Sequence, residues 1–542
     1  MTAPSKEAPL FARSGGDQTR ILIVLTLLVS LAAKFMGFVR VQQIATLLGV
    51  TVYADALLLT FQLVWFLETV LVSGAVIPNL IARVYRVEAE QGTDQAARFF
   101  LHATIWCSLG TLLYGLVLWL FADQIVVAAA PGFNSAAREL FGELLAISVL
   151  TPLCLTLSEY ASMVNRLTRN GAWYSVPQLV TNLTALVGLV LGYRLTGAAG
   201  AAKGMIVGLS VGACAVVLLQ LSVVPRAAGA RLFKYLRESL FRPLVWPGGR
   251  SFWSGVAALV LAALVSELYV YVDFYFASTV RPGGIGLISY ASRLANLANM
   301  LLVSSAFVIL EPRWAEALAE GGRAPWRRII GPDSVGLLSI LAAPVAVLLC
   351  FAPQVTGLIY QAGQMQPADA VTLNELTRIY GLSILTISAA MIMARILVLY
   401  GKARWIVLTS LAVLPIKVAL SAAFAPWFGL NGLAWATIGG LTLQVLAYAA
   451  ILSRSGIPFS LPDVTKPAVR LALVYLATGG TAVALSMPRF EQSVLIVAAW
   501  GAVLAVNIAV GAALGFAYSD AVKSLLSPAS WRSGLSKLLG RT

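Results

Sequence analysis

The chain has 542 residues, of which 59% are hydrophobic and only 11% are charged, and its mean hydropathy is +0.86. Soluble domains carry roughly 25% charged residues, so this composition excludes an ordinary soluble protein and predicts a polytopic membrane protein. The formal net charge of +15 is attributed to basic cytoplasmic loops, and no nucleic-acid partner is expected.

Apolar segments of about 20 residues, each long enough to cross a bilayer, follow one another along the chain. Gly, Pro and charged residues bound about 14 of them, so the predicted fold is an all-α polytopic membrane protein. In chain order the predicted spans are 21–48, 52–81, 98–121, 137–163, 174–195, 200–224, 252–279, 284–311, 334–358, 374–400, 404–425, 430–453, 467–487 and 492–517.

Basic residues gather in alternate connections between these spans. Arg83 and Arg86 follow the second span, and Lys402 and Arg404 follow the tenth. The opposite loops, such as "YQAGQMQPADAVTLNE", contain neither Lys nor Arg. The positive-inside rule therefore predicts a multi-pass protein with both termini in the cytoplasm.

The longest basic connection, residues 225–250, is predicted to link two six-helix lobes, 21–224 and 251–453. Residues 454–517 would add two spans, and residues 1–20 and 518–542 would be cytoplasmic tails. Two similar segments support a duplication, because "GAAGAAKGMIVG" begins at Gly197 and "GLNGLAWATIGG" begins 232 residues later, at Gly429. Duplicated halves are common in transporters and place the substrate between the lobes.

The residues that enzymes use are sparse. The four cysteines lie singly in separate apolar segments and are expected to be small hydrophobic side chains, neither disulfides nor metal ligands. His102 is the only histidine, and GxGxxG and Walker patterns are absent. We therefore expect no enzymatic activity, no cofactor and no metal.

Several charged residues nevertheless lie inside predicted spans, where a charge costs several kcal/mol unless it faces protein or water. Facing lobes would bring them to one central cavity, where cations fit a phosphate-bearing substrate. Pairing among these charges, to fix helix packing, is the alternative. The charges belong to the first hairpin of each lobe: Lys34, Arg40, Asp55 and Glu68 in one, and Glu267, Asp273 and Arg293 in the other.

The segment "KFMGFVRVQQIATLLGVTVYADALLLTFQL" resembles the opening of the MurJ-like family of lipid II flippases, within the multidrug/oligosaccharidyl-lipid/polysaccharide exporter superfamily. "VDFYFASTVRPGGIGLISYASRLANL" and "LIYQAGQM…LTRIYGLSI" are similar to later motifs of that family, in the same order. The resemblance implies a bacterial inner-membrane protein with two lobes around a cationic cavity, working by alternating access.

The same resemblance implies the cargo, an undecaprenyl-pyrophosphate-linked glycan, with polysaccharide-synthesis enzymes as candidate partners. Lys34, Arg40 and Arg293 would bind its pyrophosphate. Lys34 stands where the family pattern has Arg, and Glu68-Thr69 stands where the family usually has an Arg-Arg pair. The cargo is therefore either lipid II or another polysaccharide unit. An ion-coupled drug or small-molecule exporter on the same superfamily fold is the alternative function.

Energy coupling raises a separate hypothesis. Family members can hold a sodium ion in the second lobe, near an acid on the seventh span and polar groups on the eleventh and twelfth. This chain keeps Asp273 on the seventh span but has Lys417 on the eleventh. Lys417 would pair with Asp273 and replace the ion, whereas the alternative has Lys417 facing water.

Overall fold

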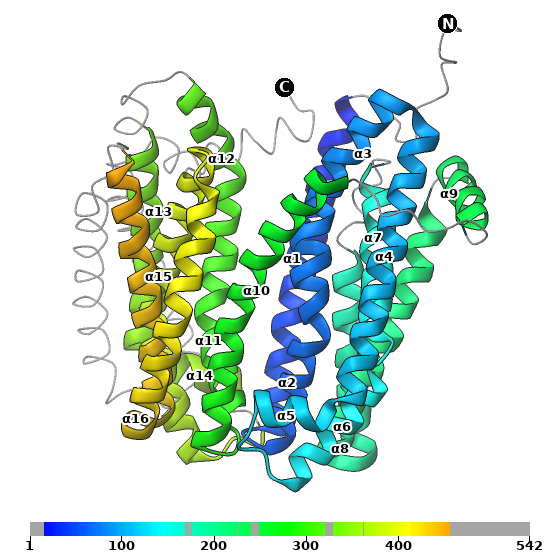
Figure 1. Cartoon of the computed structure of the whole chain (residues 1–542). Coiled ribbons are helices and arrows are strands. Elements are labelled where there is room, and N and C mark those ends of the chain that lie inside the picture. Colours follow the sequence, from blue (N-terminus) through cyan, green and yellow to red (C-terminus); the bar gives the residue numbers. More distant parts are fainter. Residues whose placement is uncertain are drawn as a thin grey trace, which may run out of the picture. The chain divides into compact units, whose positions relative to one another are not determined.

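The computed structural model describes residues 16–167, 173, 176–224, 226–239, 249–319, 329–360 and 363–455. These residues form helices joined by short connections, and the described part of the chain contains no strand (Figure 1). The predicted all-α class is therefore confirmed. The predicted spans 467–487 and 492–517 lie outside the described residues.

The chain divides into two compact units, Met1–Gly286 and Leu287–Thr542. The helices of the first unit are α1 (Gly16–Leu48), α2 (Val52–Leu67), the π-helix η1 (Glu68–Val76), α3 (Ile77–Gln91), α4 (Thr93–Leu120), α5 (Ala122–Ala129), α6 (Ser135–Ile147), α7 (Thr151–Leu167), α8 (Val176–Val223), α9 (Arg226–Ser239) and α10 (Gly249–Val280). Within this unit α8 packs along both α1 and α7, α3 packs on α4, and α10 packs on η1.

The second unit begins within α11 (Gly284–Ala298), whose first three residues still belong to the first unit. It continues with the π-helix η3 (Asn299–Val303), α12 (Ser304–Ala319), α13 (Gly331–Cys350), α14 (Ala352–Tyr360), α15 (Pro367–Leu399) and α16 (Ala403–Arg454). Here α15 packs against α13, α14 and α16. The lobe boundary expected at 225–250 rests on the sequence and stays a prediction.

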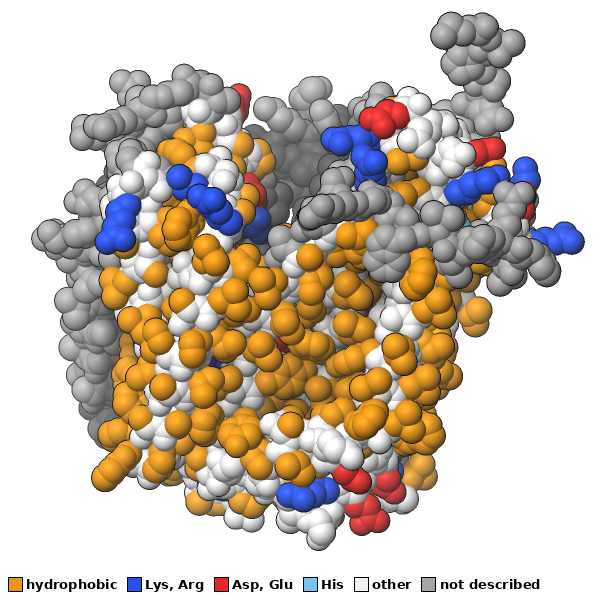
Figure 2. Space-filling model, viewed as in Figure 1, with side chains coloured by type: hydrophobic (Ala, Val, Ile, Leu, Met, Phe, Trp, Pro, Cys, Tyr) orange, Lys and Arg blue, Asp and Glu red, His pale blue; other side chains and the backbone are white. Residues whose placement is uncertain are grey.

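The apolar composition of the helices fits a bilayer. Within the described ranges, six helical segments are long and apolar enough to cross a membrane, or seven if the bent pair α6–α7 is one span. Leu195, Leu218 and Trp427 are 71–84% exposed, as side chains that meet lipid would be. Figure 2 shows hydrophobic side chains over the middle of the visible face and charged ones toward its two ends. The exact number of about 14 spans stays a prediction.

Helix α8 is two helices that fold back on each other. Its backbone leaves helical geometry at Thr196 and Gly197, and Gly197 has a φ of 75°, which favours glycine. Beyond this turn, Gly204 approaches Gly188 so closely that a Cβ on either residue would overlap the carbonyl oxygen of the other. The absence of side chains thus lets two membrane helices touch backbone to backbone.

The elements recur with the spacing that the sequence repeat predicts. Helix α16 breaks at Gly429, 232 residues after the break of α8 at Gly197. The same offset separates the start of α6 at Ser135 from the start of α15 at Pro367. Each predicted lobe also has a π-helix in its second predicted span, η1 in 52–81 and η3 in 284–311. These correspondences support an internal duplication.

Candidate functional site

Arg40 joins three helices of the first unit. Its side chain on α1 is only 5% exposed, and its Nη1 donates a 2.7 Å hydrogen bond to Oδ1 of Asn182 on α8. Its guanidinium carbon lies 4.1 Å from the centre of the Phe61 ring on α2, within cation–π range. The Nδ2 of Asn182 donates in turn to the backbone oxygen of Ala33, at 3.2 Å. Arg40 is thus a buried cation in a fixed orientation.

Lys34 lies on the same helix as Arg40 but in a different environment. It is half-buried and less than two helical turns before Arg40. The two cations therefore occupy one stretch of α1, one held by neighbouring helices and the other partly open. The assignment of both to the pyrophosphate stays a prediction.

Asp55 has a clear structural partner, the start of α11. Its carboxyl oxygens accept hydrogen bonds from the backbone N–H groups of Gly283, at 2.7 Å, and Gly286, at 2.8 Å. The first turn of a helix has unsatisfied N–H groups and a positive partial charge, so a carboxyl group there acts as a cap. Asp55 caps α11 from 228 residues away in the chain, a role that its sequence position did not predict. Its expected role in the cavity stays a prediction.

Glu68 begins the π-helix η1 in the continuous helical segment Val52–Gln91. The side chain is 4% exposed, so it lies inside the protein rather than on its lipid surface. π-Helical turns are rare and are frequent at functional sites. Glu68 therefore lies at a backbone irregularity in the same segment as Asp55.

Acidic residues on α10 also lie inside the first unit. Glu267 accepts a 2.6 Å hydrogen bond from Nε2 of Gln62 on α2, and Asp273 is 7% exposed. Gln62 and Asn182 were not predicted from the sequence as partners of these charges. The signal that could have found them is that each is a polar residue in an apolar segment. The charges of the first hairpin and of α10 thus share one compact unit.

The remaining candidates, Arg293 and Lys417, belong to the second unit. Arg293 is half-buried on α11, one turn after Tyr290, whose backbone oxygen accepts a 3.2 Å hydrogen bond from the hydroxyl of Tyr360. Lys417 on α16 is 1% exposed, which argues against the alternative that it faces water. Its pairing with Asp273, and the convergence of Arg293 and Arg40 on one cavity, stay predictions.

A sequence model described as "Lipid II flippase MurJ" matches residues 44–506 of the chain. The chain belongs to the MurJ family.

Relatives agree with this assignment at low identity. The chain is similar to a probable lipid II flippase MurJ of Rhizobium meliloti, with 23% identity over 90% of this chain and 92% of the relative. A probable lipid II flippase MurJ of Rickettsia prowazekii is 19% identical over 69% of this chain and 71% of the relative. The first relative therefore matches nine tenths of this chain, and the second matches about two thirds of it.

Solved structures give the same fold. The chain matches a lipid II flippase MurJ in an inward closed conformation with a TM-score of 0.69, at 16% identity, over 91% of this chain and 98% of the other. An inward-facing multidrug resistance MATE family transporter of the MOP superfamily matches with a TM-score of 0.59 at 14% identity, over 85% and 99%. The MurJ-family and MATE folds are thus both similar to this chain.

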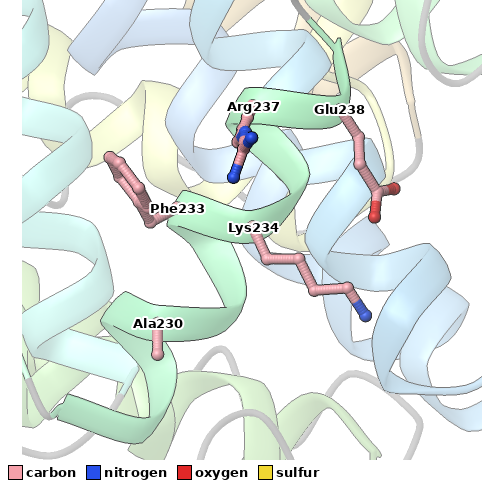
Figure 3. Close-up of a pocket in the computed structure, with 5 residues that line it drawn as sticks. All are labelled: Ala230, Phe233, Lys234, Arg237 and Glu238. Atoms are coloured by element: carbon pink, nitrogen blue, oxygen red, sulfur yellow. The ribbon is translucent and has the colours of Figure 1, made fainter.

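The MurJ-family chain also has a basic surface helix outside its spans. Helix α9 lines an open cavity of about 590 Å³ with Ala230, Phe233, Lys234, Arg237 and Glu238 (Figure 3). Arg98 on α4 holds α9 through a 3.3 Å ion pair with Glu238. Burial and the nearby Asp94 raise the pKa of Tyr235 to about 12, so its hydroxyl stays protonated at neutral pH. This cavity lies within the basic connection 225–250.

The described residues contain no group of three or more His, Cys, Asp or Glu side chains placed to hold a metal ion. The candidate residues are instead buried and half-buried charged side chains on helices of each unit. Charged side chains inside a membrane protein are suited to binding a charged molecule.

Proposed function

We propose that this chain moves an undecaprenyl-pyrophosphate-linked glycan of the lipid II class across the bacterial cytoplasmic membrane by alternating access. The observation that carries the proposal is the family match over residues 44–506. A flippase moves its cargo unchanged, so the proposed activity is transport rather than catalysis. The exported unit would serve peptidoglycan or cell-surface polysaccharide synthesis.

We assign Arg40 to the cargo. A charged side chain inside the membrane is expensive, so it is retained where it faces the protein interior and serves a function. Arg40 is held by Asn182 and Phe61, and a planar guanidinium in a fixed orientation matches the oxygens of a pyrophosphate. Lys34 on the same helix adds a second cation, and Arg293 supplies one from the second unit.

Transport of fluorescent lipid II in proteoliposomes tests this assignment. We expect Arg40→Ala to lower the transport rate at least tenfold, because the oriented charge is lost. Asn182→Ala should lower it less, because the guanidinium remains but loses its 2.7 Å partner. Arg194→Ala, which removes an exposed arginine of α8, is the matched control and should leave transport unchanged. Full activity of purified, folded Arg40→Ala protein would exclude the assignment.

An ion-coupled exporter of drugs or other small molecules is the second candidate function. The observation in its favour is the structural similarity to a MATE transporter, with a TM-score of 0.59. Transport assays with each cargo separate the two functions. If the wild-type protein does not move lipid II but moves cationic dyes in response to an ion gradient, the exporter is correct. Binding of a cationic drug is disfavoured by Lys34, Arg40 and Arg293, which have the same sign.

We also infer that both termini face the cytoplasm and that enzymes of polysaccharide synthesis deliver the cargo. The support for the orientation is the distribution of Lys and Arg, for example Lys402 and Arg404 against the uncharged residues around the break of α16 at Gly429. A reporter that is active only in the periplasm should be inactive when fused after Thr542 and active when inserted at Gly363. The opposite pattern of reporter activity would show that both termini face the periplasm.

A further inference from the structure

Two cysteines from different helices touch each other in the first unit. The Sγ atom of Cys154 on α7 lies 3.3 Å from the Sγ atom of Cys214 on α8. The residues are 60 positions apart in the chain, and the packing of α7 on α8 brings them together. The four cysteines lie singly in the sequence, and it is helix packing that places these two side by side as free thiols.

Hydrogen bonds on both sides of the pair fix how α7 and α8 face each other. About one turn before it, the hydroxyls of Thr151 and Ser210 are 2.6 Å apart. Beyond it, Nδ2 of Asn165 donates a 3.1 Å hydrogen bond to the backbone oxygen of Gln220. These bonds join α7 to α8 on both sides of the pair, with the two thiols opposed. A disulfide, with an S–S bond of about 2.05 Å, needs only a small closing movement.

The pair is accessible from the hydrocarbon side of α8. Cys214 is exposed and Cys154 is half-buried. Val211, one turn before Cys214, is 57% exposed, and Leu218, one turn after it, is 71% exposed. Residues at this spacing share one face of a helix, so Cys214 lies on an apolar face of a membrane-spanning segment. A reagent dissolved in lipid reaches this face, whereas charged cytosolic thiols such as glutathione do not enter hydrocarbon.

We propose that Cys154 and Cys214 are a redox modification site, which a quinone-class oxidant dissolved in the membrane converts to an intramolecular disulfide. The two S–H bonds break and one S–S bond forms. The two electrons and two protons reduce the quinone to its quinol, so the reaction balances. A dithiol reductant reverses it by thiol–disulfide exchange. The disulfide joins α7 to the second half of α8 within the first unit.

The other two cysteines provide internal controls. Cys107 on α4 is 3% exposed, and Cys350 on α13 belongs to the second unit. Replacing both with Ala leaves the pair as the only thiols of the chain, because the sequence has four cysteines. Cys154→Ser and Cys214→Ser each remove one half of the pair. A positive control places cysteines at Thr151 and Ser210 in a chain without the native pair.

The experiment uses the full-length Cys107→Ala/Cys350→Ala protein in liposomes, treated with a fully substituted benzoquinone that cannot add to thiols. Maleimide labelling and mass spectrometry should find both thiols blocked, a mass lower by about 2 Da, and a Cys154–Cys214 cross-linked peptide. Dithiothreitol should restore both thiols. Either single Cys→Ser change should abolish the cross-link.

Two results would overturn the proposal. In the first, both native thiols remain open to maleimide under conditions that cross-link the Thr151→Cys/Ser210→Cys control. In the second, oxidation yields only dimers joined through Cys214 of two copies, without the intramolecular peptide.

Discussion

The carboxyl group of Asp55 on α2 accepts a 2.8 Å hydrogen bond from the backbone N–H of Gly286, in the first turn of α11. Its second oxygen accepts from Gly283, whose φ of 79° is left-handed. A Cβ at Gly283 would also overlap Val50, just before α2. The chain thus enters α11 through a glycine turn whose N–H groups point at a buried acid.

We expect Asp55→Ala to destabilise the protein by about 2 kcal/mol, because the change removes a helix cap and leaves two N–H groups without their acceptor. Asp55→Asn retains one acceptor oxygen and should have a smaller effect. The thermal unfolding midpoint in detergent, followed by intrinsic fluorescence, measures both changes.

Asp123 supplies the control for this prediction. It is an exposed acid in the first turn of the short helix α5, so Asp123→Asn should change stability by no more than about 0.5 kcal/mol. Equal midpoints for Asp55→Ala and Asp123→Asn would contradict the capping role.

The close contact between the two halves of α8 allows us to predict how replacing one glycine changes stability. At Gly188 an added methyl group would overlap the backbone oxygen of Gly204, and backbone cannot swing aside as a flexible side chain can. Gly188→Ala should therefore separate the two halves and destabilise the protein by about 1–3 kcal/mol. The change in unfolding midpoint measures this effect, and lipid II transport should fall with the folded fraction.

Gly142 on α6 is the matched position, because a Cβ there meets nothing within 4 Å. Alanine favours helix over glycine by about 0.8–1.0 kcal/mol, so Gly142→Ala should be neutral or stabilising. If Gly188→Ala also leaves the unfolding midpoint unchanged, the close packing of α8 is not a constraint.

The helical architecture was predictable because hydrophobic length is a strong signal. The repeat offset read from Gly197 and Gly429 also marks the breaks in α8 and α16, since a left-handed backbone position favours glycine. The folding of α8 back onto itself was harder to predict from the sequence. Small residues at four-residue spacing, such as Gly188 and Gly192, do not tell from the sequence which partner helix they touch.

The site was predictable only as a set of charges. Arg40 stands out because a cation in an apolar run is costly, but its partners lie on other helices, Phe61 on α2 and Asn182 on α8. The capping role of Asp55 is not predictable, because nothing near it in the chain indicates that the start of α11 needs a cap. Long-range partners of this kind depend on tertiary packing, which a single sequence does not encode as a local pattern.

Glu68 allows a test of cargo specificity. It stands where family members usually carry an arginine, and a negative charge opposes the binding of a pyrophosphate. At roughly 10 Å one unit charge contributes about 0.4–2 kcal/mol, depending on the local dielectric. We therefore expect Glu68→Gln to rescue a strain depleted of its lipid II flippase better than the wild-type chain does, and Glu68→Arg to rescue it best. Colony formation at matched expression measures the order.

Glu68 is buried, so a loss of folded protein must be separated from a loss of specificity. The amount of each variant that elutes as a single species in detergent provides this control. If well-folded Glu68→Gln and Glu68→Arg proteins both lose rescue, the acid is required and the charge reversal is not a specificity determinant.

Lys417 allows a test of energy coupling. The side chain is 1% exposed on α16, two residues after Pro415 inside the helix. An ammonium group inside the membrane is a compact fixed cation, and we hypothesise that it takes the place of a sodium ion and pairs with Asp273. Replacing sodium with potassium in proteoliposomes should then change the lipid II transport rate of the wild-type chain by less than about twofold. Lys417→Met should slow transport in potassium and make the rate respond to sodium, whereas the matched change Lys402→Met, at the start of α16, should do neither.

Asp273→Asn combined with Lys417→Met should recover part of the lost rate, because the double change removes the uncompensated acid. A wild-type rate that falls tenfold without sodium would contradict the replacement, and a double variant no better than Lys417→Met would contradict the pairing.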